Sequence, residues 1–282
     1  MRDGPGRPLI NENPRRECGM NRAGVSECLL LSEAAYLTRF EAADMASSIG
    51  AKLLYVFRVA AVHCYVFQKE GTLFFATRGT DITSLVNIVL DTRILPRWDK
   101  EVGIVHRGFY IWADLLWEDV LDVLKREGSA ADRIVFCGHS AGGAASTLLG
   151  VKAAAVLAMH GGAKPYVVTF GAPMVGTILF SRKVSSMTNH IRVTNNNDPV
   201  PHLPFWPVYT HPGGTRYHIM ADGEIMKNPV MLSLIKDVPH GLFYFLWTFF
   251  KEMVRTKSIL LAVVNSLRTG DHFIRNYKGY FR

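Results

Sequence analysis

A serine between two glycines stands where an apolar run gives way to a run of small residues. The stretch Ile134–Ser146 reads IVFCGHSAGGAAS and contains the pattern Gly-x-Ser-x-Gly centred on Ser140. A sharp turn from strand to helix forces such a serine into strained backbone geometry and projects its hydroxyl above the sheet edge. The helix that begins at Ala141 supplies free N–H groups and positive potential for a developing oxyanion. These residue types at this spacing predict a serine nucleophile for acyl transfer.

A serine nucleophile needs a base, and the base needs a carboxylate that fixes its tautomer. Asp198 follows the apolar run His190–Thr194 and three asparagines, and it precedes Pro199. Functional groups of an open α/β sheet gather at the carboxyl ends of its strands. This position favours Asp198 as the orienting carboxylate, in the chain order serine, aspartate, histidine. The alternative is a turn-capping aspartate, which is common before proline.

The base is then one of the five histidines that follow the aspartate: His202, His211, His218, His240 and His272. The first is too close to Asp198 in sequence to be presented by a separate segment. The next two flank the Gly213-Gly214 turn and look like hairpin residues. His240 opens an aromatic run, whereas His272 follows a loop-like break after a long helical stretch. The residues by themselves favour His272 without excluding His240.

An oxyanion hole needs two hydrogen-bond donors, and one of them is the N–H of Ala141, directly after the nucleophile. The second usually comes from the loop after an earlier strand. The apolar run Thr72–Arg78 ends in Gly79-Thr80, where glycine lets the backbone approach the reacting carbon and Thr80 offers both N–H and O–H. This chemistry requires no cofactor or metal, and the sequence has no CxxC pair and no histidine cluster with zinc spacing.

The elements that would position these groups alternate along the chain. Two strand-like runs around a Glu70-Gly71 turn predict an antiparallel pair, with a further strand-like run over 52–60 before it. Helical periodicity appears over 26–37 and again over 108–127, 141–160 and 177–187, and short apolar strands lie at 133–138, 166–171 and 190–194. This order predicts an α/β class with a mixed, mostly parallel central sheet flanked by helices. We expect a loose arm over 1–22 and a single domain over 23–282.

Composition limits the classes of function without choosing one. The chain has 282 residues, 49% of them hydrophobic and 20% charged, which excludes a disordered or collagen-like protein. The net charge of +8 permits nucleic acid, an anionic membrane surface or an acidic substrate as partner. No basic run interleaved with aromatics is present, so we expect no nucleic-acid partner.

The cysteines and the first residues bear on the compartment. Cys64 and Cys137 lie in apolar runs and are expected to be free buried thiols, while Cys18 and Cys28 remain a less favoured candidate pair. The start of the chain has no apolar run of the secretory type, and no uncharged apolar stretch of about 18 residues occurs. We expect a cytoplasmic or membrane-peripheral location unless a leader has been removed.

Six stretches, in order along the chain, resemble motifs of the class 3 (fungal-type) lipase family of α/β-hydrolases. They are RGT at 78–80 (oxyanion loop), VHRGF at 105–109 (start of the helix after the lid), GHSAGG at 138–143 (nucleophile elbow), VTFGAPMVG at 168–176, NDPVPHLP at 197–204 (acid loop) and DHFIRNY at 271–277 (histidine segment). The similarity covers roughly residues 50–282, and the set is far more specific than any one of its pieces.

The resemblance implies a single α/β-hydrolase domain with a short lid over the site. Carried over by position, it implies Ser140 as nucleophile, Asp198 as acid and His272 as base, with Thr80 and Ala141 forming the oxyanion hole. It places the lid helix at about 82–90, with an apolar face that would meet lipid when open: Ile82, Leu85, Val86, Val89 and Leu90. The family's secreted fungal members carry disulfides, but this chain has no cysteine after Cys137, so an N- to C-terminal bridge is impossible.

The resemblance predicts a carboxylic ester hydrolase, with triacylglycerol lipase as the leading hypothesis and an acylglycerol at a lipid–water interface as its substrate. Phospholipase A1 and a general or feruloyl-type esterase share the same elbow, and a non-catalytic lipid-binding protein is the alternative outside enzymes. The aromatic stretch over 241–250 is either a core helix or an interfacial helix that makes peripheral membrane contact.

Overall fold

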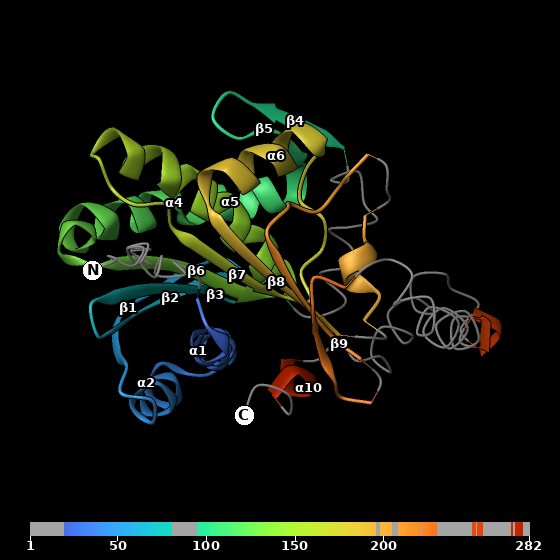
Figure 1. Cartoon of the computed structure of the whole chain (residues 1–282), viewed down its shortest axis with the longest axis horizontal. Coiled ribbons are helices and arrows are strands. Elements are labelled where there is room, and N and C mark those ends of the chain that lie inside the picture. Colours follow the sequence, from blue (N-terminus) through green and yellow to red (C-terminus); the bar gives the residue numbers. More distant parts are fainter. Residues whose placement is uncertain are drawn as a thin grey trace, which may run out of the picture.

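The computed structural model describes residues 20–80, 95–195, 198–204, 208–220, 222–229, 250–251, 253–255, 272 and 274–278. Within these residues, eight strands form one sheet in the order β1-β2-β3-β6-β7-β8-β9-β10, and two strands form a separate hairpin (Figure 1). The predicted lid at 82–90, the arm as far as residue 19, and the aromatic stretch before Phe250 lie outside the described residues.

The central sheet is parallel in its middle and antiparallel at both edges. Its strands are β1 (Lys52–Val59), β2 (Val62–Lys69), β3 (Thr72–Thr77), β6 (Arg133–His139), β7 (Tyr166–Phe170), β8 (Asn189–Asn195), β9 (Thr215–Ile219) and β10 (Ile225–Lys227). β3, β6, β7, β8 and β9 run parallel. β1 and β2 pair antiparallel at one edge and β10 at the other. The predicted mixed, mostly parallel sheet is confirmed.

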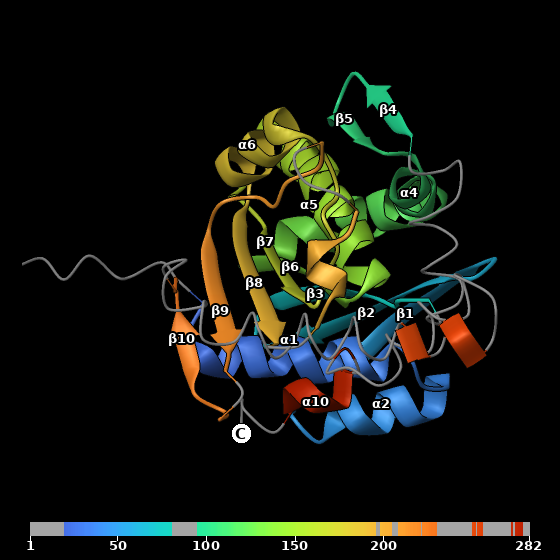
Figure 2. The same ribbon diagram turned by 90° about the vertical axis from the view of Figure 1, so that its right-hand side faces the viewer.

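Helices cover both faces of this sheet (Figure 2). On one face lie α1 (Arg22–Ala34), α2 (Arg39–Ser47) and α10 (Ile274–Lys278); on the other lie α4 (Arg107–Glu127), α5 (Ala141–Met159) and α6 (Ile178–Met187). The separate hairpin, β4 (Pro96–Asp99) and β5 (Gly103–His106), leads directly into α4. Each face buries its own hydrophobic cluster, so the sheet lies between two cores.

α5 is the central helix of the fold because it is small and apolar all round. From Ala141 to Ala154 every residue is buried, including Lys152. In the described part of the chain it is the one helix long and apolar enough to cross a membrane, yet 72% of its most apolar window is buried inside the protein. Its composition therefore reflects close packing against β6 and β7 rather than a lipid environment.

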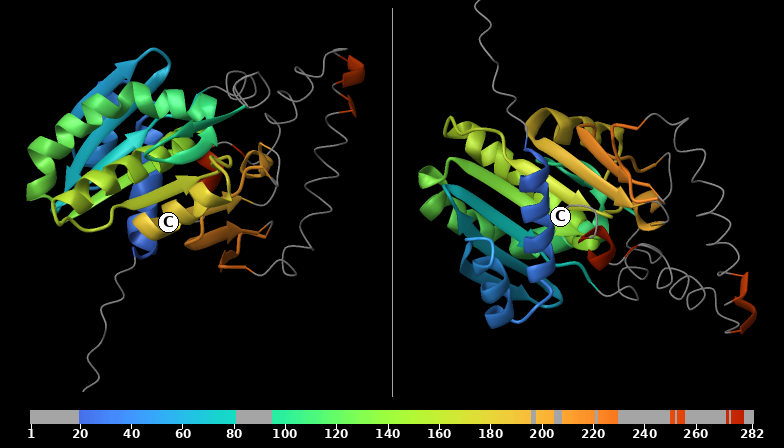
Figure 3. Two further views of the ribbon diagram at one scale, coloured as in Figure 1. Left: turned by 90° about the horizontal axis from the view of Figure 1, so that it is seen from above. Right: turned by 60° about the horizontal axis from the view of Figure 1, so that its bottom comes forward.

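The elements match the sequence patterns with local differences. α1 begins at Arg22 rather than at 26, because the Asn21 side chain caps it by accepting a hydrogen bond from Gly24 N at 3.0 Å. It then runs across the sheet against β6 (Figure 3). The hairpin predicted around Gly213-Gly214 is wrong, since the chain there enters β9, which pairs with parallel β8 and then with β10. Among the described residues, the three cysteines Cys28, Cys64 and Cys137 are free and buried.

Candidate active site

The nucleophile turn joins β6 to α5 and has the strained backbone that its sequence predicts. Ser140 adopts φ 58° and ψ −132°, a conformation that a residue with a side chain rarely adopts. Its N–H donates to the carbonyl of Phe170 at 2.9 Å, which ties the turn to the neighbouring strand. A Cβ added at Gly138 would lie 2.6 Å from the Gly142 backbone, and one at Gly142 would lie 2.2 Å from the Thr77 carbonyl. The two glycines are therefore steric requirements of this turn.

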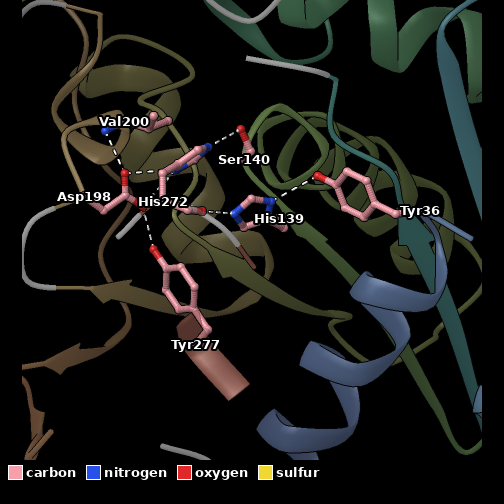
Figure 4. A network of polar contacts seen from close by, with 7 residues as sticks. All are labelled: Tyr36, His139, Ser140, Asp198, Val200, His272 and Tyr277. Carbon is pink, nitrogen blue, oxygen red and sulfur yellow. Dashed lines mark hydrogen bonds and ion pairs between the residues drawn. The ribbon is translucent and has the colours of Figure 1, made fainter. Parts of the chain in front are cut away.

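Ser140, His272 and Asp198 form one chain of hydrogen bonds (Figure 4). His272 Nε2 lies 2.9 Å from Ser140 Oγ, and its Nδ1 lies 2.9 and 3.0 Å from the two carboxylate oxygens of Asp198. All three residues are buried. The histidine comes from a segment far from both of its partners in sequence, since it lies 132 positions after Ser140 and 74 positions after Asp198.

Two further donors hold the buried carboxylate of Asp198. The Tyr277 hydroxyl donates to Oδ2 at 2.6 Å and the Val200 N–H donates to Oδ1 at 2.9 Å (Figure 4). Burial alone raises the pKa of Asp198, but the charge and hydrogen bond of His272, together with these two donors, outweigh it and lower the pKa below its ordinary value. The carboxylate is therefore ionised and able to orient the imidazole.

A second line of contacts reaches the histidine loop from the opposite side. His139 Nε2 lies 2.6 Å from the His272 carbonyl oxygen, and its Nδ1 lies 3.0 Å from the Tyr36 hydroxyl (Figure 4). A carbonyl can only accept, so Nε2–H donates to it. Burial, and then the charge of His272, lowers the pKa of His139 to about 3, so its neutral Nδ1 accepts from the tyrosine hydroxyl. His139 thus links the end of α1 to the loop that carries His272.

The loop after β3 packs against the nucleophile turn. A Cβ at Gly79 would meet the Tyr36 hydroxyl at 2.3 Å and the His139 carbonyl at 2.7 Å, and would lie 3.4 Å from Ser140 Cβ. The next residue, Thr80, is half-buried. On the other side of the serine, Ala141 is the first residue of α5 and fully buried, so its N–H belongs to the orphan donors of a helix start.

The remaining sequence candidates lie elsewhere. His202 ends the 3₁₀ helix η3 (Val200–His202), His211 Nε2 donates to the Pro201 carbonyl at 2.6 Å, and His218 Nδ1 lies 2.8 Å from Thr194 Oγ1. The structure brings none of these three to Ser140. His240 and the five apolar residues of the predicted lid (Ile82, Leu85, Val86, Val89 and Leu90) lie outside the described residues.

Sequence reasoning missed three residues around this site. The DHFIRNY stretch contains Tyr277 and the GHSAGG stretch contains His139, but neither motif indicates a role for these two residues. The feature that could have identified them is a second polar side chain in the same motif as a predicted catalytic residue: Tyr277 with His272, and His139 with Ser140. Tyr36 carries no such signal, because its contact with His139 joins positions 103 residues apart.

Known proteins with a similar fold are lipases. The fold matches the crystal structure of the lipase from Rhizopus microsporus var. chinensis with a TM-score of 0.63 and 20% sequence identity, covering 80% of this chain and 90% of that one. It matches the Rhizomucor miehei lipase in its propeptide complex with a TM-score of 0.60 and 23% identity, covering 72% of this chain and 70% of that one. These likenesses show the fold alone, which is that of the α/β-hydrolases.

Sequence comparison finds similarity to one family over part of the chain. Residues 74–208 match the family Lipase (class 3), and this span holds Thr80, Ser140 and Asp198. The chain is 32% identical over 172 residues to Lipase ZK262.3 of Caenorhabditis elegans, covering 58% of this chain and 45% of that protein. It is 39% identical over 140 residues to Secreted mono- and diacylglycerol lipase 1 of Fusarium solani, covering 47% and 38%. The chain thus spans less than half the length of these relatives. Residues 74–208 are therefore similar to the class 3 lipase family.

Proposed function

We propose that this chain is a serine carboxylic ester hydrolase that acts on acylglycerols, with triacylglycerol as the leading substrate. The observation that carries the proposal is the hydrogen-bonded series from Ser140 through His272 to Asp198, with the serine held in a strained turn at φ 58°. Backbone strain of this kind destabilises the fold and is concentrated at functional sites, so it favours a catalytic role for the serine over a structural one.

In the proposed mechanism His272 Nε2 takes the proton of Ser140 while the hydroxyl oxygen attacks the ester carbonyl. Asp198 keeps His272 in the tautomer with Nδ1–H and stabilises the imidazolium that forms. The N–H of Ala141 and the N–H and O–H of Thr80 stabilise the tetrahedral oxyanion. The imidazolium then protonates the leaving alcohol, and water attacks the acyl-enzyme with His272 again acting as the base.

The neutral state of His139 supports this assignment of roles. A second imidazole lies with its ring centroid 4.8 Å from that of His272, and a second base so close would make the assignment ambiguous. Burial lowers the pKa of His139 to about 3, and both of its nitrogens are occupied by the His272 carbonyl and the Tyr36 hydroxyl. His139 has no free nitrogen with which to take a proton from the serine.

Replacement of Ser140 tests the nucleophile. Ser140→Ala should abolish hydrolysis of a p-nitrophenyl ester and labelling by a fluorophosphonate probe. Ser146→Ala is a suitable control, because Ser146 is equally buried in α5 but donates to the Cys137 carbonyl, outside the site. Near-normal turnover by Ser140→Ala would refute the proposal.

Two histidine variants test the base. His272→Ala should reduce turnover by about 10⁴-fold or more, whereas His240→Ala should leave it within a few-fold of the original. The opposite pattern would transfer the role of base to His240.

The proposed lipid substrate requires contact with an interface. We propose that the lid at 82–90 and the aromatic residues up to Phe250 provide it by peripheral membrane contact; Phe250 itself is 55% exposed. Replacing Phe249 and Phe250 together by serine should weaken liposome binding while the fold survives. Unchanged binding would refute this part of the proposal.

Chain-length profiles identify the substrate class. Activity should rise when a long-chain triacylglycerol passes from monomer to emulsion. Higher turnover on phospholipid would instead assign phospholipase A1 activity, and activity confined to short soluble esters would assign a general esterase.

A further inference from the structure

One face of the β8–β9 pair carries basic side chains where a core would normally be apolar: His190 and His218 are buried, and Arg192 and Arg216 are half-buried. Along β8, His190, Arg192 and Thr194 alternate with Ile191 and Val193, which belong to the hydrophobic cluster on the opposite face. On β9 the partners of Arg192 and Thr194 are Arg216 and His218. Paired residues of neighbouring strands share a face and lie about 5 Å apart at the backbone. The side chains of two arginines and two histidines therefore lie on the same face of this strand pair.

The buried donors of this patch lack partners. Nε and Nη1 of Arg192, Nε of Arg216 and Nε2 of both His190 and His218 are buried without a hydrogen-bond partner. Within the described ranges no carboxylate forms an ion pair with either arginine. Guanidinium N–H groups that are buried without an acceptor are costly, so these atoms call for a compensating group.

The neighbouring histidines do not supply the negative charge that would balance the two arginines. Burial, and then Arg216, lowers the pKa of Arg192 to about 10, while burial and then Arg192 lowers the pKa of His190 to about 3. His211, on the segment that follows η3, also has its pKa lowered by burial and by Arg192. The carboxylate of Asp198 acts electrostatically on His202 but is already held by His272, Tyr277 and Val200.

We propose that the β8–β9 patch, formed by His190, Arg192, Arg216 and His218, is a binding site for a phosphate group. Phosphate carries close to two negative charges near neutral pH, which match two arginines, and its oxygens can accept from several N–H donors at once. A carboxylate would leave one positive charge uncompensated. A metal cation would be repelled, and the described residues contain no cluster of metal-ligating side chains.

The phosphate can be free or carried by a lipid headgroup, and the two sources share the same recognition chemistry. The site is separate from the proposed ester hydrolysis, since the side-chain hydrogen bonds of Ser140 and His272 join them to each other and to Asp198 and not to the four patch residues. It is attached to the same strand as the acid loop, because Arg192 and Asp198 lie six positions apart. The proposal therefore stands or falls independently of the catalytic assignment.

Thermal unfolding with and without inorganic phosphate tests the site. Saturating phosphate should raise the Tm of the unaltered protein by about 5 °C at constant ionic strength, whereas chloride should not. Arg216→Glu places a carboxylate opposite Arg192, so it should raise the Tm in phosphate-free buffer and remove the phosphate-dependent shift. Arg216→Gln, which removes one charge but keeps amide donors, should show a reduced shift.

The control is a charge-matched variant on another element. Arg126→Met removes an arginine that is 66% exposed on α4, and it should keep the full phosphate shift. Equal shifts in the unaltered protein and Arg216→Glu, or no shift beyond that of chloride in the unaltered protein, would overturn the proposal.

Vesicles distinguish the two sources of phosphate. If a headgroup occupies the site, co-sedimentation with vesicles containing phosphatidic acid should fall in Arg216→Glu and remain normal in Arg126→Met. If free phosphate is the ligand, both variants should co-sediment equally while the phosphate-dependent shift in Tm is still lost in Arg216→Glu.

Discussion

Two charged side chains on and just after β8, a buried aspartate and a half-buried arginine, differ in how their buried polar atoms are satisfied. The carboxylate of Asp198 is 2% exposed and receives hydrogen bonds from His272, Tyr277 and Val200. The guanidinium of Arg192, six residues earlier, has two buried N–H groups without a partner and a second arginine as its neighbour across the sheet. Burial is costly for both charges, but the chain itself compensates only the first. A carboxylate whose hydrogen bonds all come from the protein suits orientation of a catalytic base. A guanidinium with unpartnered N–H groups suits binding of an anionic ligand.

The largest effect on turnover should come from removing the negative charge of Asp198. Asp198→Asn keeps the shape but favours the wrong tautomer of His272, because the amide nitrogen repels Nδ1–H. Turnover should fall by about 10⁴-fold with little change in KM. Steady-state kinetics measure this, and a loss below tenfold would mean that Asp198 does not orient the base.

Removing one charge from each region should change the free energy of unfolding in opposite directions. Asp198→Ala removes the hydrogen bonds that the Tyr277 hydroxyl and the Val200 N–H donate to the carboxylate, and it should destabilise the protein by about 1–3 kcal/mol. Arg216→Met relieves the repulsion on Arg192 and should be neutral or stabilising by about 1–4 kcal/mol in phosphate-free buffer. Urea denaturation of both variants gives the two values, and the comparison fails if their signs agree.

The buried histidines predict how stability depends on pH. Burial lowers the pKa of His139 and His190 to about 3 and that of His106 and His218 to about 4, from 6.5. Between pH 6.5 and 4 these side chains stay neutral in the folded protein but take up protons in the unfolded chain. The free energy of unfolding should therefore fall with falling pH, by about 1.4 kcal/mol per pH unit for each histidine.

His190→Gln isolates one of these contributions. Denaturation at pH 7, 6 and 5 should give a slope smaller than that of the unaltered protein by one histidine's share. An unchanged slope would show that His190 is protonated in the folded state and would remove it from the neutral donors of the β8–β9 patch.

The smallest effect should come from removing one of the hydrogen-bond donors to the Asp198 carboxylate. Tyr277→Phe takes away one of the hydrogen bonds that lower the pKa of Asp198, so turnover should fall by about tenfold with KM unchanged. Tyr110→Phe is the matched control, since its hydroxyl donates to Asp99 at 2.9 Å, a carboxylate outside the site. Equal losses in the two variants would mean that Tyr277 has only a structural role.

The fold was largely predictable because its signals are local. The turn around Glu70-Gly71 and the alternation of strands and helices from Arg133 onward depend on neighbouring residues, and the structure confirms the resulting sheet. The interpretation of Gly213-Gly214 as a hairpin failed for the complementary reason. A glycine pair specifies a change of direction, but the partner of the next strand, here β8, is chosen by contacts distant in sequence. The single-domain organisation and the lid remain predictions.

The sequence by itself determined the strained turn at Ser140, because glycine is the one residue type that fits the steric limits at positions 138 and 142, and a local pattern shows this. Only the tertiary structure decided which described histidine meets that serine, since the contact joins residues 132 positions apart. It also decided that Tyr36 contacts His139 and that Arg192 lies opposite Arg216, neither of which spacing along the chain can express. The steric limits of the backbone depend on consecutive residues, so they can be predicted from the sequence. The electrostatic partners of a buried group depend on the register of strands and the packing of helices.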